Sequence, residues 1–160
     1  MNSDISARDE ADDLRVRFEA QMRRAFFDKL RDDLKNEKPE AVDWLIKLHL
    51  ELQKRLAALR PGRADEIADK MDNELFARKL RNRAFRHDDM YGMVDFSYEI
   101  LSEIVAPDMD ASLSEKRNSL LVEMQSGDAV FSSIVPAFLQ GVHELLDESI
   151  ARIHQLYNKQ

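Results

Sequence analysis

The fold is constrained most by a leucine-rich segment, residues 39–60. Its leucines are spaced three or four residues apart, which places them on one stripe of an α-helix. That stripe consists of Leu45, Leu48, Leu52, Leu56 and Leu59. A second apolar line lies beside it, formed by Val42, Ile46 and Leu50, and we expect Trp44 to be a packing anchor on the other flank. A helix that is apolar around most of its circumference must be covered on several sides, so this segment should be the centre of a helical bundle.

The composition narrows the class of protein. A chain of 160 residues fits one domain, and only four glycines and four prolines suit a helix-rich globule. There is no cysteine, which excludes disulfides and thiolate chemistry and suits a reducing, cytoplasmic location. A net charge of −7 argues against binding to nucleic acid or to an acidic membrane surface. No apolar run reaches the roughly 20 residues of a membrane span, and the acidic N-terminus does not resemble a secretory signal.

The N-terminal third divides into two expected parts. Residues 1–13 are acidic and polar, and we expect them to be flexible, either frayed or loosely helical. From there to residue 157 we expect a single helical domain. Its first apolar residues recur every four positions: Leu14, Phe18, Met22, Phe26, Leu30 and Leu34. Because such a repeat drifts by about 40° at each step round a helix, we expect a break near Arg23 rather than one long helix.

Breakers and apolar spacing divide the rest of the chain. Pro39 suits the first position of the leucine-rich helix, which Pro61 and Gly62 should end. We expect one amphipathic helix through Ile67, Met71, Leu75, Phe76 and Leu80, then helices over about 90–104 and 112–125. A stop at 126–128 should separate the helix over 112–125 from a C-terminal helix. Pro136 should kink or restart that final helix. The predicted fold is therefore an all-α, single-domain bundle of five to seven helices around residues 39–60.

A search for reactive groups identifies no catalytic, cofactor-binding or metal-binding residues. Glutamate does not stand three positions before any of the four histidines, so the pattern of a di-iron bundle is missing. Residues 108–119 begin like a calcium loop, but they lack its central glycine and its final carboxylate. Phosphate-binding loops and nucleophile elbows are missing too. These absences favour a non-enzymatic protein without a cofactor.

One charged segment differs from the rest of this acidic chain. Five cations occur within nine residues with no carboxylate among them: Arg78, Lys79, Arg81, Arg83 and Arg86. One interpretation is a contact for a partner protein, whose identity the sequence does not reveal. The other is a solvated helix end, where cations also complement the helix dipole. If the first is correct, reversing Arg81 and Arg83 to glutamate should weaken partner binding.

Several short segments resemble the T-complex protein 11 family, over roughly residues 25–150. The similar segments are Ala25-Phe26-Phe27-Asp28, Leu59-Arg60-Pro61-Gly62-Arg63, Met71-Asp72-Asn73-Glu74-Leu75 and Ile104-Val105-Ala106-Pro107-Asp108. Members of that family usually extend over several hundred residues. This chain of 160 residues therefore resembles a compact, N-terminal part of the family's domain. It departs from the family at Phe27, where tryptophan is usual, and at Asn82-Arg83, where histidine and glycine are common.

The resemblance implies an all-helical, non-enzymatic signalling regulator. The family is linked to cyclic-AMP and protein-kinase-A signalling, and in animals to sperm function, and it supplies no catalytic or ligand residues to carry over. The first hypothesis is therefore a cytoplasmic protein-binding module. The alternative is a virus-encoded or structural helical protein that forms homo-oligomers or binds a host factor, for example in cell-death regulation.

Overall fold

The computed structural model describes residues 2–125 and 131–158, which form seven α-helices and two short 3₁₀-helices and contain no strand. The α-helices are α1 (Asn2–Lys35), α2 (Pro39–Leu59), α3 (Ala64–Lys70), α4 (Asn73–Arg81), α5 (His87–Ile104), α6 (Asp110–Gln125) and α7 (Phe131–Asn158). The 3₁₀-helices are η1 (Pro61–Arg63) and η2 (Pro107–Met109). The predicted all-α bundle is confirmed.

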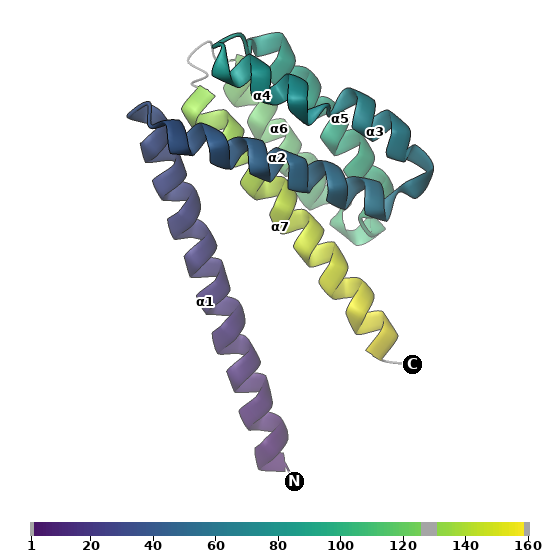
Figure 1. The fold of residues 1–160 in the computed structure, drawn as a ribbon. Coiled ribbons are helices and arrows are strands. Elements are labelled where there is room, and N and C mark those ends of the chain that lie inside the picture. The colour runs from purple at the N-terminus through teal and green to yellow at the C-terminus, as the bar shows by residue number, and fades with distance from the viewer. Residues whose placement is uncertain (1, 126–130, 159–160) are drawn as a thin grey trace.

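Helix α2 is the centre of the bundle, as the leucine pattern predicts. It packs against α1, α3, α4, α5 and α7, which surround it on several sides (Figure 1). Leu45, Leu52 and Leu56 are completely buried along its inner face. Trp44 packs edge-to-face on Phe26 with ring centroids 5.1 Å apart, but it remains 45% exposed and so anchors only the flank of α2.

Helix α1 is continuous from Asn2 to Lys35, so the expected break near Arg23 is wrong. The segment contains neither proline nor glycine, and nothing in it opposes helix propagation. Only its C-terminal half lies on the bundle, where it runs antiparallel to α7 (Figure 1). Arg31 there donates a hydrogen bond to Gln140 over 2.9 Å. Residues 2–13, expected to be flexible and either frayed or loosely helical, are the first part of the same helix.

The segment predicted as one helix through residues 67–80 is two helices, α3 and α4. The carboxylate of Asp72 accepts hydrogen bonds from the backbone N–H groups of Glu74 (3.0 Å) and Leu75 (3.1 Å). This N-cap starts α4 as a separate helix. Leu75, predicted to lie on the apolar face of that single helix, is 41% exposed.

The last three α-helices close the other side of the core. Helix α6 begins at Asp110, two residues before the predicted capping-box serine, because η2 leads directly into it. Pro136 lies inside α7, which continues through it and does not restart there. Phe138, Val142 and Leu145 of α7 are completely buried. The predicted stop at residues 126–128 lies outside the described residues.

Candidate protein-interaction surface

The five predicted cations lie at the end of α4 and in its connection to α5. Arg78, Lys79 and Arg81 are in the last turn of α4, where positive charge complements the helix dipole. The helix then closes with two backbone hydrogen bonds, from Arg83 N–H to Leu80 C=O (3.2 Å) and from Ala84 N–H to Lys79 C=O (2.7 Å). This is the pattern of a Schellman motif, with Arg83 in the left-handed region at φ 55°.

Two of the five cations are engaged within the chain. Lys79 Nζ lies 2.5 Å from Asp89 Oδ1 and fastens α4 to α5. Burial alone would raise the pKa of Asp89, but hydrogen bonds from Lys79 and from the Arg86 backbone outweigh it and lower that pKa. Arg81 lies 3.6 Å from Asp43 of α2, with both side chains more than half exposed. The first pair is structural, whereas the second contributes little to stability.

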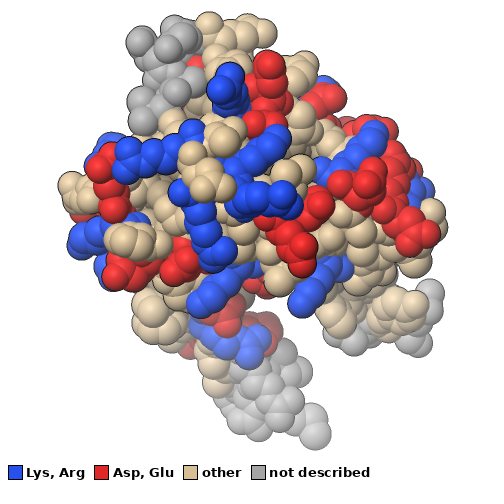
Figure 2. All heavy atoms as spheres, turned by 45° about the horizontal axis from the view of Figure 1, so that its top comes forward, with Lys and Arg blue, Asp and Glu red and all other residues tan. Residues whose placement is uncertain are grey.

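The other three cations are Arg78, Arg83 and Arg86. All are exposed, and none has a carboxylate within ion-pair distance among residues 2–125 and 131–158. Figure 2 shows lysine and arginine side chains gathered on the face of the molecule that carries α4, with acidic groups beside them. The structure therefore divides the predicted set into two engaged cations and three exposed guanidinium groups.

A groove that the sequence analysis did not identify lies beside these arginines, between α3, α4 and α5. It encloses about 450 Å³. Its apolar lining comes from Met71, Leu75, Phe76, Phe85, Met93 and Phe96. Its polar lining includes Asp72, Asp88, Asp89, Asp95, Glu99, Lys70 and Lys79. In the sequence, only Leu75 at the start of α4 could have indicated this groove. Its exposure can be recognised only once the break between α3 and α4 is known.

A buried histidine supports the wall of this groove. The imidazole of His49 stacks on Phe76 with centroids 4.1 Å apart, and its Nδ1–H donates to Asn73 Oδ1 over 2.9 Å. Burial lowers the pKa of His49, despite the hydrogen bond to Asn73 and the charge of Asp72, so the ring is neutral at pH 7. A neutral histidine held in this way joins α2 to α4 as a structural element.

A second buried histidine lies where α1, α2 and α7 meet. Arg55 donates to His143 Nδ1 (2.9 Å) and to Asp147 (2.7 Å), and Arg23 of α1 also pairs with Asp147 (2.8 Å). The other ring nitrogen of His143 faces the Leu48 carbonyl at 3.3 Å. Burial is the main cause that lowers the pKa of His143, and the neighbouring Arg55 charge acts in the same direction. These four side chains hold three helices together.

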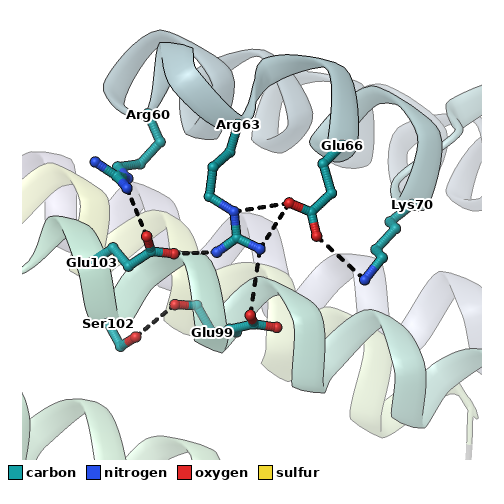
Figure 3. Close-up of polar contacts among 7 residues, drawn as sticks. All are labelled: Arg60, Arg63, Glu66, Lys70, Glu99, Ser102 and Glu103. Carbon is teal, nitrogen blue, oxygen red and sulfur yellow. Dashed lines mark hydrogen bonds and ion pairs between the residues drawn. The ribbon is translucent and has the colours of Figure 1, made fainter.

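A network of ion pairs connects the end of α2 and helix α3 to α5 (Figure 3). Arg63 pairs with Glu66 (2.9 Å), Glu99 (3.4 Å) and Glu103, and Arg60 pairs with Glu103 over 2.6 Å. Hydrogen bonds from Arg63 are the main cause that lowers the pKa values of Glu66 and Glu103. Carboxylates in this state stay ionised at neutral pH, which suits a clamp between helices. Both arginines belong to a segment on which the family resemblance rests.

Other kinds of site find no support in the described part of the chain. Histidine and carboxylate side chains in residues 2–125 and 131–158 do not gather into a group of three or more that could hold a metal ion. Among these helices, none has an apolar stretch long enough to cross a lipid bilayer.

Comparison with known proteins identifies the family. The family model described as T-complex protein 11 matches residues 1–148 of the 160-residue chain. No match was found among curated proteins or among solved structures. The matched residues include all four segments that resemble the family and extend the similarity over the whole of α1. The chain therefore belongs to the T-complex protein 11 family.

Proposed function

We propose that this protein is a non-enzymatic, cytoplasmic interaction module that binds a partner protein through the α4–α5 connection. The proposal rests on one observation, which is that Arg78, Arg83 and Arg86 are exposed and form no ion pair in the described residues. Elsewhere on the bundle, most arginines are paired with carboxylates, as Arg63 and Arg152 are. These three are exposed and form no ion pair with a carboxylate in the described residues, although the chain has an excess of acidic groups; the charge of Arg86 does help to lower the pKa of Asp89. Their guanidinium groups are available for the carboxylates of an acidic partner segment.

The neighbouring groove adds apolar area to this surface. Lys79 and Phe85 line it, so it is continuous with the charged segment. Interfaces commonly combine an apolar centre with a polar rim, and arginine is enriched in them. A partner that places carboxylates on the arginines could place an apolar side chain beside Phe85.

Family membership suggests the kind of partner. By resemblance to T-complex protein 11 relatives, the partner would belong to the cyclic-AMP and protein-kinase-A pathway. The chemistry of the surface adds a condition, because the segment that binds should be acidic.

The test is affinity purification with mass spectrometry, comparing wild type with Arg78→Glu/Arg83→Glu. This variant spares Lys79 and Arg81, whose ion pairs would otherwise confuse the result. The matched control is Lys35→Glu/Lys54→Glu, which makes the same change of charge at two other exposed positions. We expect at least one partner to be lost, about tenfold or more, from the first variant and retained by the second.

Two results would contradict the proposal. If both variants capture the same proteins as wild type, the arginines do not bind a partner. If the lost partner has no connection to protein kinase A, the interaction surface stands and the signalling assignment is wrong.

A further inference from the structure

The groove between α3, α4 and α5 is bridged by an ion pair near each end. At one end, Lys79 of α4 pairs with Asp89 of α5 over 2.5 Å. At the other, Arg63 of η1 pairs with Glu99 of α5 over 3.4 Å (Figure 3). The α5 wall runs from Asp88 to Glu99, which is about 16 Å along the helix axis. A groove of this length suits a peptide segment better than a compact small molecule.

A glycine in the middle of the α5 wall has no packing role within the chain. Glycine lowers the stability of a helix interior relative to alanine. A Cβ at Gly92 would meet no atom within 4 Å in the described residues, apart from its own stretch of helix. By comparison, Gly141 of α7 lies against α5, since a Cβ there would be 3.6 Å from the hydroxyl oxygen of Tyr98. Because Gly92 lines the groove, its missing side chain leaves room for the backbone of another molecule to approach α5 closely.

The groove walls around Gly92 are apolar and accessible. Met93 and Phe96 of α5 lie on one side and Leu75 of α4 on the other. Leu75 is 41% exposed, and Phe85 in the α4–α5 connection is half-buried. The volume of about 450 Å³ lies within the range of about 300–1,000 Å³ that is typical of ligand sites. Apolar side chains of an occupant could therefore be covered here.

The charges of the groove favour a basic occupant. Five carboxylates and only two lysines line it, an excess of three negative charges. Their ion-pair partners outside the lining add two arginines and one glutamate, which still leaves an excess of two. Asp88 forms no ion pair and no side-chain hydrogen bond in the described residues. Asp88, Gly92, Asp95 and Glu99 share one face of α5, so cations of an occupant would find carboxylates on both sides of the glycine.

We propose that the groove binds a basic, apolar peptide segment of a partner protein, whose backbone passes over Gly92. Its apolar side chains lie against Leu75 and Phe85, and its lysine or arginine side chains reach Asp88 and Glu99. The inference rests on the proposed function and deepens it, because it describes the part of the partner next to the acidic part that the exposed arginines bind. The partner would thus carry an acidic stretch beside a basic, apolar one.

Peptide binding to the full chain tests this inference. The probe is a fluorescently labelled peptide of leucine and lysine at the spacing of an amphipathic helix, and its counterpart carries glutamate in place of lysine. Fluorescence anisotropy should show saturable binding of the lysine peptide below about 100 µM, and binding of the glutamate peptide at least about tenfold weaker. Equal binding, the reverse order, or no saturable binding of the lysine peptide would overturn the proposal.

Substitutions in and beside the groove locate the binding. Gly92→Leu fills the groove and should weaken binding of the lysine peptide about tenfold. Tyr91→Leu, at a neighbouring position that is 47% exposed and does not line the groove, should leave it unchanged. Asp88→Asn should weaken binding about threefold, whereas Glu19→Gln, at an exposed position on α1, should not. Unchanged binding to Gly92→Leu would show that the peptide adheres elsewhere and would overturn the proposal.

Thermal unfolding separates a binding role of Gly92 from a structural one. Gly92→Ala should raise Tm by about 1–4 °C, because alanine favours the helix and its Cβ meets no neighbour. A lower Tm would mean that the chain itself needs this glycine, which would overturn the inference. None of these variants changes Arg78, Arg83 or Arg86, and the lysine peptide has no carboxylate side chain for them to bind. The groove inference can therefore fail while the arginine surface stands.

Discussion

The two halves of α1 differ in their surroundings although they form one helix. The C-terminal half buries Phe27 and Leu30 against the bundle, and the N-terminal half leaves Phe18 and Leu14 in solvent. Both halves have helix-forming sequence and apolar side chains at regular spacing. The difference shows that an apolar stripe identifies a helix face that needs a partner, but not whether the partner lies in the same chain.

The sharpest test of this comparison uses one residue type at two places. Phe27→Ala removes a buried ring and should lower the free energy of unfolding by about 3–5 kcal/mol. Phe18→Ala should change it by less than about 0.5 kcal/mol, because this ring is 62% exposed. Urea unfolding followed by circular dichroism measures both. Equal losses would mean that the N-terminal half of α1 packs on its own bundle.

The pH dependence should arise in the bundle and not in the projecting half. Burial lowers the pKa values of His49 and His143 below the unfolded value of about 6.5. In the unfolded chain these two imidazoles therefore bind protons at pH values at which they stay neutral in the folded chain. The free energy of unfolding consequently falls as the pH decreases below 6.5. At pH 5.5 the loss is at most about 1.4 kcal/mol for each histidine. Unfolding of His143→Gln should depend less on pH between 7.5 and 5.5 than unfolding of wild type, and an unchanged dependence would contradict the assignment.

The junction between the two halves depends on Asp147, which pairs with Arg23 of α1 and Arg55 of α2. Because this carboxylate is 42% exposed, Asp147→Asn should cost only about 1 kcal/mol. A double-mutant cycle with Arg23→Ala measures how much of that loss belongs to α1. A coupling energy near zero would mean that helix packing alone holds α1 on α7.

The smallest effect is expected at the helix ends. Glu37, after α1, and Arg83, after α4, both have left-handed backbone, with φ of 56° and 55°. Each closes its helix with a backbone hydrogen bond, Glu37 N–H to Leu34 and Arg83 N–H to Leu80. Glycine adopts this conformation without strain, so Glu37→Gly and Arg83→Gly should each raise stability by up to about 1 kcal/mol. Thermal unfolding would show it, and a loss at either position would mean that its side chain makes a stabilising contact.

Much of the architecture follows from local sequence chemistry. The leucine spacing of residues 39–60 predicts the central helix, and Pro39 and Pro61 predict its bounds within one or two residues, because proline acts on its own backbone. The prediction of one helix over residues 67–80 is wrong at one position, Asp72. Asp72 favours a cap there, but its carboxylate can act as one only when the helix is interrupted, and that interruption depends on how α3 and α4 pack on α2.

The candidate surface was predicted in part. The sequence shows five cations close together, but it does not show which of them have partners. Lys79 is engaged because α5 returns to place Asp89 beside it, and Arg81 because α2 presents Asp43. The groove beside them combines residues from α2 to α5 that are up to 50 positions apart, so no local pattern could reveal it.

Local sequence patterns were enough to show that the chain is helical, that residues 39–60 form its centre and that it resembles the T-complex protein 11 family. These properties depend on propensity, spacing and short segments that act locally. The folded structure was needed to show that α1 is one helix covered along half its length, that three arginines of the cationic segment remain exposed, and that Leu14, Phe18 and Met22 of α1 are exposed. Burial and ion pairing are relations between distant residues, and they exist only once the chain has folded.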